Sequence, residues 1–241
     1  MITVTEKQFE NIKQAALAVY PQELCGILTA DRFIHCENKA DDPLSGFKLS
    51  AVDYARYHAD AIAIVHTHIP PQRHALPIDV RTPSYADIVG QRDMKLPWLI
   101  YGCDGVGVSA EPVQLPRVPN KNYLDRPFIW FINDCYSLVR DYYRFELGIE
   151  LPDHKADKDY ADLRNTNDLF AEHIQSYGFK GYDSLDDLKN GDLLLLGSNG
   201  FQRNHLGIYH DGNVLHQSGL SVSQPLSDFY GRIYQVLKYE G

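Results

Sequence analysis

Several features are missing from this chain of 241 residues, and each absence excludes a class of protein. No stretch of eighteen apolar residues occurs, so we expect no membrane-spanning helix. Residues 1–6 do not combine a basic segment with an apolar core, so we expect any export to use a route other than a signal peptide. Acidic residues outnumber basic ones, giving a net charge of −9 and a pI of about 5.5, which argues against a nucleic-acid partner.

Cysteine is also rare, with four residues in the whole chain: Cys25, Cys36, Cys103 and Cys135. Their spacing does not match the paired cysteines of a structural zinc site. A chain that is 44% hydrophobic can bury one large core or two smaller ones, and it does not need disulfide bonds to hold its fold. We therefore expect reduced thiols, with Cys25, Cys36 and Cys103 packed as small apolar side chains.

The distribution of proline predicts two domains. Prolines punctuate a polar segment with little periodicity at residues 111–127. We place a boundary near residue 118, which gives a first domain at 1–118, a linker at 119–126 and a second domain at 127–241. Helical and strand-like periodicities are mixed in both domains, so the fold class is expected to be α+β or α/β.

The second domain contains a helix that is expected to begin at a cysteine. Asn133 and Asp134 are favourable N-cap residues, apolar side chains then recur at helical spacing, and Gly148 is a suitable C-terminal stop. Cys135 thus falls in the first turn, where free N–H groups and the helix dipole favour an anion. The thiol is predicted to ionise easily and to act as a nucleophile.

A base for this nucleophile is expected on a hairpin farther along the chain. Two apolar, strand-like segments flank the turn sequence Asp211-Gly212-Asn213. His205 and His216 lie on the two arms of this hairpin. If the arms pair, both rings can share one face, and the second imidazole can orient the first. The alternative is a buried cysteine and two histidines with no common role.

The first domain has its own group of candidate residues. His66 and His68 end an apolar strand, and the two-residue period of a strand places both imidazoles on one side. Asp87 is the predicted third ligand, because two imidazoles and a carboxylate form a zinc site with one open position. Glu23 could act as the base on an attacking water, and Ser84 could stabilise the oxyanion. The alternative is a pair of solvated or packed histidines.

This group resembles the motif of the JAMM (MPN) metalloproteases, in which a Glu precedes His-x-His-Pro and then Ser-x-x-Asp. The matching residues are Glu23, His66, His68, Ser84 and Asp87. The resemblance implies a mixed sheet with flanking helices, a bound Zn²⁺ ion, and peptidase or isopeptidase chemistry.

Two departures separate this chain from that motif. Ile69 stands where the family usually has proline, and eighteen residues instead of ten separate His68 from Asp87. A spacing of ten selects Asp79 as the third ligand, but Leu76 then occupies the serine position. We prefer Asp87 with a loop insertion, because the sequence around it resembles the family's helix start. A degenerate site that serves as a non-catalytic docking module is the competing interpretation.

The second domain resembles the NlpC/P60 cysteine peptidases. The matching segments are Asp134-Cys135, Gly191-Asp192-Leu193, residues 205–209 and His216. Tyr136 stands where many members have serine, and Phe131 where many have glycine. The resemblance implies a papain-like fold and a thiol hydrolase that cuts peptidoglycan stem peptides next to a D-γ-glutamyl unit. Asp192 would then either meet the amine end of the substrate or cap a turn.

With its two halves in this order, and with residues 126–139 between them, the chain resembles a family of tail tip assembly proteins from lambda-like siphophages. This similarity implies peptidoglycan stem peptides and phage tail tip proteins as partners. It also implies that the protein is made in the host cytoplasm and acts in the bacterial cell wall or periplasm. The virion tail tip is an alternative location. The competing interpretation is a processing protease, whose zinc half cuts a tail protein during assembly.

Overall fold

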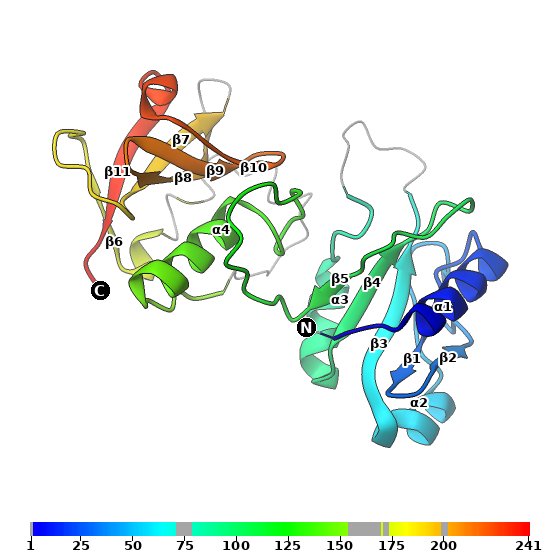
Figure 1. The fold of residues 1–241 in the computed structure, drawn as a ribbon. Coiled ribbons are helices and arrows are strands. Elements are labelled where there is room, and N and C mark those ends of the chain that lie inside the picture. Colours follow the sequence, from blue (N-terminus) through cyan, green and yellow to red (C-terminus); the bar gives the residue numbers. More distant parts are fainter. Residues whose placement is uncertain (1, 71–78, 154–169, 171–173, 199–201) are drawn as a thin grey trace. The chain divides into compact units, whose positions relative to one another are not determined.

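The computed structural model describes residues 2–70, 79–153, 170, 174–198 and 202–241 (Figure 1). The chain divides into two compact units, Met1–Val118 and Pro119–Gly241. Each unit contains one β-sheet and few helices, which confirms the mixed α+β class. Residues 119–126, expected to form a linker, lie inside the second unit. Among the described residues, no helix combines the length and apolar character that a membrane crossing requires.

The first unit is built on a five-stranded sheet with the strand order β2-β1-β3-β4-β5. Strands β3 and β4 are parallel, and the other neighbouring pairs are antiparallel. Its elements are α1 (Glu6–Val19), β1 (Cys25–Thr29), β2 (Phe33–Cys36), α2 (Ala51–Tyr57), η1 (His58–Asp60), β3 (Ala61–His68), α3 (Tyr85–Met94), β4 (Trp98–Gly102) and β5 (Val113–Leu115).

Helix α1 covers one face of this sheet. Thr5 caps the helix with its side chain, and the buried Ile12 packs against Val65 and other apolar residues of the sheet. Because side chains alternate along a strand, the neighbours of Val65 and Thr67 on β3 point to the other face. His66 and His68 therefore lie on the sheet face away from α1.

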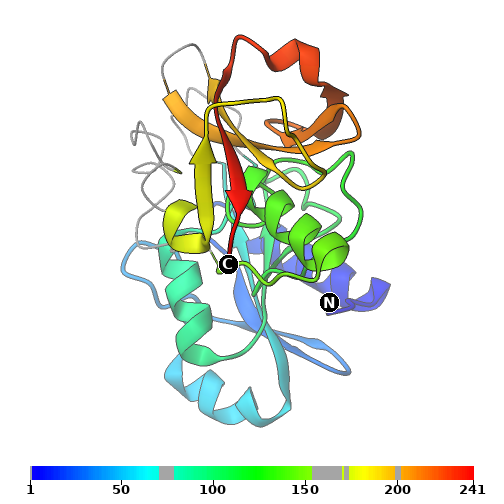
Figure 2. The same cartoon turned by 90° about the vertical axis from the view of Figure 1, so that its left-hand side faces the viewer.

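The second unit is built on a six-stranded antiparallel sheet with the strand order β10-β9-β8-β7-β11-β6. Its elements are α4 (Cys135–Tyr142), η2 (Tyr143–Leu147), η3 (Ile174–Tyr177), β6 (Phe179–Tyr182), β7 (Leu193–Ser198), β8 (Gln202–His210), β9 (Asn213–Gln217), β10 (Ser221–Pro225), η4 (Leu226–Phe229) and β11 (Ile233–Tyr239). Both views show α4 running alongside this sheet (Figures 1 and 2).

Both faces of the second sheet are buried, but by different elements. Leu206 and Leu215 share a core with α4. Leu196 and Val214, on the opposite face, pack with Phe229 of η4 and with β11. The side chains on the two faces of β8 and β9 therefore belong to two separate apolar clusters.

A buried ion pair ties the start of the second unit to α4. Arg126 Nη1 lies 2.7 Å from Asp141 Oδ2, and the two side chains are 2% and 1% exposed. The same guanidinium donates to the carbonyl oxygens of Asn120 and Asn122, and the backbone of Arg126 pairs with Ser221 of β10. A buried charge is costly unless it is paired and hydrogen-bonded, so these contacts hold residues 120–126 in place.

Replacing Arg126 with methionine should lower the free energy of unfolding of the second unit by about 3–5 kcal/mol, because the Asp141 carboxylate stays buried without this counter-charge. Hydrogen exchange of the α4 amides measures the loss. The matched control is Arg140→Met on the same helix, whose partner Asp153 is 65% exposed. That change should cost less than about 1 kcal/mol. Equal losses from the two variants would contradict the importance given to the buried pair.

Candidate active sites

The cysteine helix begins where the sequence predicts. Cys135 is the first residue of α4, and Asp134 is its N-cap. The two oxygens of the buried Asp134 carboxylate accept hydrogen bonds from the backbone amides of Ser137 (2.7 Å) and Phe131 (2.8 Å). Gly148 ends the helical segment in a left-handed conformation with φ 70°. The cap fixes the helix start and leaves the Cys135 amide in the first turn.

The two histidines lie on the predicted hairpin. Asp211 and Gly212 join β8 to β9 with positive φ values of 47° and 80°, which is the pattern of a two-residue type I′ turn. Gly207 pairs with His216, and the two-residue period places His205 on the same face. A Cβ atom added at Gly207 would lie 2.4 Å from a methyl group of Val214 on the neighbouring strand, so the packing at this position favours glycine.

The two imidazoles form a buried hydrogen-bonded pair. His205 Nε2 lies 3.1 Å from His216 Nδ1, and His216 Nε2 lies 2.8 Å from Gln224 Oε1. The His216 ring also packs edge-on against Phe229, with 5.1 Å between ring centroids. Gln224 was not predicted from the sequence, because it lies on the short strand β10, which has no clear periodicity.

The thiol approaches the sheet from the other side. Cys135 shares the α4 core with Leu206, and the backbone amides of Leu206 and Tyr136 lower the pKa of its thiol, against the larger effect of burial. His205 and His216 lie on the opposite face of the hairpin, with Val214. Within the part of the chain that the structure describes, no hydrogen bond joins the sulfur to either ring. The structure thus brings the sulfur to the residue next to His205, without the predicted contact between nucleophile and base.

Burial controls the protonation of this site. It raises the pKa of the Cys135 thiol to about 12, and the neighbouring Asp134 carboxylate adds to the increase. Burial also lowers the pKa of His205 to about 3, helped by His216 and the positive charge of Arg232. The prediction that the helix start makes the thiol easy to ionise is therefore wrong for the resting protein. The pair at rest is a neutral thiol and a neutral imidazole.

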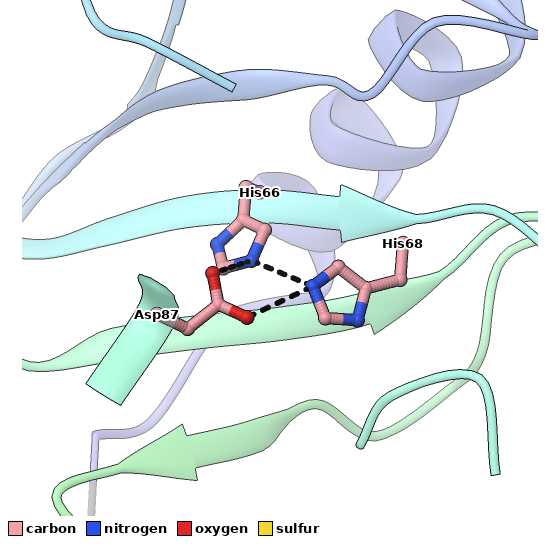
Figure 3. A group of neighbouring side chains, drawn as sticks. All are labelled: His66, His68 and Asp87. Carbon is pink, nitrogen blue, oxygen red and sulfur yellow. Dashed lines mark hydrogen bonds and ion pairs between the residues drawn. The ribbon is translucent and has the colours of Figure 1, made fainter. Parts of the chain in front are cut away.

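The other group of predicted residues converges in the first unit, on β3 and the start of α3 (Figure 3). Distances of 3.2 Å separate His66 Nε2 from His68 Nε2, His66 Nε2 from Asp87 Oδ1, and His68 Nε2 from Asp87 Oδ2. In a tetrahedral zinc site with bonds of about 2.0–2.1 Å, ligand atoms lie about 3.3 Å apart. The three side chains are therefore spaced as zinc ligands would be.

The protons in this group show why it could hold a cation. His68 Nδ1 lies 3.0 Å from the carbonyl oxygen of Val80 and donates its proton there. A neutral His68 then directs the lone pair of Nε2 at the Asp87 carboxylate, which is repulsive without a proton or metal ion between them. Burial lowers the pKa of His68, but Asp87 outweighs it and the net shift is upward. His66 lacks a similar anchor, because among the described residues its buried Nδ1 has no partner.

The two candidate third ligands have different surroundings. Ser84 caps α3, and its amide and hydroxyl donate to Asp87 Oδ2 at 2.7 and 2.8 Å, which orients the carboxylate toward the imidazoles. Asp79 instead accepts two hydrogen bonds from the Arg81 guanidinium. Asp87 therefore lies in the group and Asp79 does not. Residues 71–78, within the loop where the insertion is predicted, lie outside the described residues.

Glu23 lies buried near the same group. Burial raises the pKa of its carboxyl to about 7, and the nearby charges of Asp87 and Asp42 act in the same direction, against the opposing charge of His68. A carboxyl group that titrates near neutral pH can both accept and release a proton, which is what a general base at a hydrolytic site requires.

Two comparisons relate this chain to known proteins. Residues 125–237 match the NlpC/P60 family. This half of the chain is therefore similar to a class of cysteine peptidases, in which Cys135 and the two hairpin histidines are the candidate reacting groups. The chain is 29% identical over 244 aligned residues to "Tail tip assembly protein K" of Escherichia phage N15. The alignment covers 98% of this chain and 90% of that protein. The JAMM resemblance of residues 1–118 stays a prediction.

The Gly191-Asp192-Leu193 segment has a structural role here. Gly191 adopts φ 98°, and its carbonyl oxygen accepts a hydrogen bond of 2.7 Å from the Tyr143 hydroxyl. Asp192 Oδ2 accepts from the amide of Lys189 at 2.9 Å and lies 3.7 Å from Lys238 Nζ. These contacts favour the second of the two roles considered for Asp192, the capping of a turn at the start of β7.

Alkylation of Cys135 should be slow at pH 7 and should accelerate about tenfold per pH unit up to pH 9, because the thiolate is the reacting species and the raised pKa keeps it scarce. Peptide mass spectrometry after short iodoacetamide pulses measures each cysteine separately. In urea-unfolded protein, the rate should level off near the pKa of an ordinary thiol. A folded-state rate that does not change with pH would show that a thiolate–imidazolium pair exists at rest.

Proposed function

We propose that the second unit is a thiol hydrolase that cuts peptidoglycan stem peptides, next to a D-γ-glutamyl unit as the NlpC/P60 similarity implies. The observation that carries this proposal is the buried, hydrogen-bonded pair of His205 and His216, in which His205 is next to Leu206, a residue that shares a core with Cys135. A nucleophile at a helix start, a base and an orienting group are the components of cysteine peptidase chemistry.

The reaction starts from neutral groups. Cys135 bonds to the peptide carbonyl carbon while its proton passes to His205, and His205 then gives the proton to the leaving amine. Water then bonds to the carbon of the thioester and gives a proton to His205, and this proton passes to the Cys135 sulfur as the carbon–sulfur bond breaks and the acid leaves. The Cys135 amide, in the first turn of α4, is the candidate donor to the oxyanion. The His205 ring has to turn toward the sulfur when substrate binds, and catalytic contacts are often longer before substrate is present.

For the first unit, the proposal is a JAMM-type zinc site with peptidase activity. His66, His68 and Asp87 would hold the ion, and Glu23 would act as the general base. Zinc, when bound, supplies Lewis-acid catalysis to peptide hydrolysis. The ligand spacing and the raised pKa of Glu23 support this assignment. Ser84 directs its hydroxyl at Asp87 in the resting protein, so an oxyanion role for Ser84 requires that hydroxyl to turn toward the substrate.

The relative from phage N15 supplies the biological setting of the proposal. We extend tail tip assembly to this chain, with phage tail tip proteins and peptidoglycan stem peptides as its partners. The protein would be made in the host cytoplasm and act in the cell wall or periplasm, with the virion tail tip as a further location. A processing protease acting on a tail protein, or a first unit that only docks, are the alternatives that the experiments below separate.

Cys135→Ala should reduce the release of new amine groups from purified sacculi by at least about a hundredfold, because the nucleophile is removed. Fluorodinitrobenzene labelling of the sacculi measures the release. Cys103→Ala, which removes a buried thiol from the first unit, is the control and should keep full activity. Release by Cys135→Ala at the parent rate would refute the thiol mechanism.

Asp87→Asn should abolish zinc binding, whereas Asp79→Asn should leave it intact, because only Asp87 faces the two imidazoles. Inductively coupled plasma mass spectrometry of protein purified with zinc measures the metal, and we expect about one ion per chain in the parent. A parent that binds no zinc, or an Asp79 variant that loses it, would refute the metal site and favour a docking module.

A further inference from the structure

The hydrogen-bonded chain of the second unit continues beyond the two histidines to Gln224 on β10. We propose that Gln224 is a positioning residue that sets the tautomers of His216 and His205, so that His205 presents an unprotonated Nδ1 to the thiol. This inference rests on the proposed thiol hydrolase function, and it extends the Cys–His–His arrangement by one group.

The hydrogen bonds fix the positions of the protons, starting from Gln224. Gln224 Oε1 can only accept, so His216 Nε2 carries the proton of their 2.8 Å hydrogen bond. A neutral imidazole has one proton, so His216 Nδ1 has a lone pair. That lone pair accepts the proton of His205 Nε2 at 3.1 Å. The one proton of His205 is thereby on Nε2, and Nδ1 has a lone pair that can take the proton of Cys135 once the ring has turned toward the sulfur.

These proton positions hold only if both rings are neutral, and the surroundings of the rings keep them neutral. Burial lowers the pKa of both His205 and His216, and the Arg232 guanidinium, just before β11, lowers both further. The hydrogen bond to Gln224 raises the pKa of His216, but the net shift stays downward. The other elements against the rings contribute Leu196 of β7 and Phe229 of η4, which carry no charge. Among the described residues, no carboxylate contributes to the pKa shift of either ring. A neutral ring has two tautomers, so a group that selects one of them has an effect.

The register of the sheet explains why residue 224 can make this contact. Val222 pairs directly with His216, and Gln224 lies two residues farther along the same face of β10. If the amide turned to present its NH₂ group, His216 would carry its proton on Nδ1 instead. His205 would then be protonated on Nδ1 and could not act as a base. A side chain at residue 224 that can only accept a hydrogen bond should therefore preserve these tautomers. A side chain that can neither accept nor donate one should lose them.

Nuclear magnetic resonance of the ring nitrogens tests the tautomers without any need for turnover. In Cys135→Ala protein, the ¹⁵N shifts of His205 and His216 should both show a protonated Nε2. Adding Gln224→Glu should preserve this pattern, whereas adding Gln224→Met should produce a mixture of tautomers. The inference is overturned if His205 is mainly protonated on Nδ1, or if Gln224→Met leaves both rings unchanged.

Kinetics on a stem tetrapeptide containing the D-γ-glutamyl linkage gives the second test. Gln224→Met should lower kcat about tenfold or more with KM within about twofold, because a fraction of His205 has the wrong tautomer and the His216 ring that orients it loses its own hydrogen-bond partner. Gln224→Glu should keep kcat within about threefold and move the acidic limb of the pH profile upward, because a carboxylate favours the imidazolium. Ser223→Ala, on the other face of β10, is the matched control and should match the parent.

The two tests separate the inference from the function on which it rests. Equal kcat for Gln224→Met and the parent, or equally poor Met and Glu variants, would overturn the positioning role. A parent that cuts no stem peptide would refute the proposed substrate, and the nitrogen shifts would then decide the role of Gln224 alone.

Discussion

The register of the β8–β9 hairpin is the constraint on which the second unit depends. Asp211 and Gly212 adopt left-handed conformations, which glycine, asparagine and aspartate adopt more readily than other residues. That turn sets Gly207 opposite His216, and the ring of His216 can then reach His205 on one side and Gln224 on the other. A slip of one residue would turn one of the rings into the α4 core, where apolar side chains leave it no polar partner.

The two units use paired histidines in opposite electrostatic settings. His66 and His68 surround a carboxylate that is held in place by Ser84, and the close lone pairs call for a positive ion or proton. His205 and His216 lie near a guanidinium instead, and they stay uncharged. The first arrangement suits the binding of a cation, and the second suits the acceptance of a proton during a reaction. Residue type alone does not distinguish them, whereas the charge of the neighbouring group does.

The sequence predicted the parts of the fold that depend on local signals. The capped helix at Cys135 and the hairpin are confirmed, because capping residues and turn residues act within a few positions. The four edge strands β2, β5, β6 and β10, of three to five residues each, were not predicted from the sequence. An edge strand has one neighbour and is often short and polar, so it leaves little periodicity. Gln224 was missed with its strand.

The direction predicted for the Cys135 pKa shift was wrong, because burial is a tertiary property that the helix start does not reveal.

The buried Arg126 has a mechanical consequence. Its guanidinium binds the Asp141 side chain of α4 and also the carbonyl groups of Asn120 and Asn122, which precede it in the chain. A pull on the backbone at residue 119 would therefore be passed through Arg126 to α4, the helix that begins at Cys135.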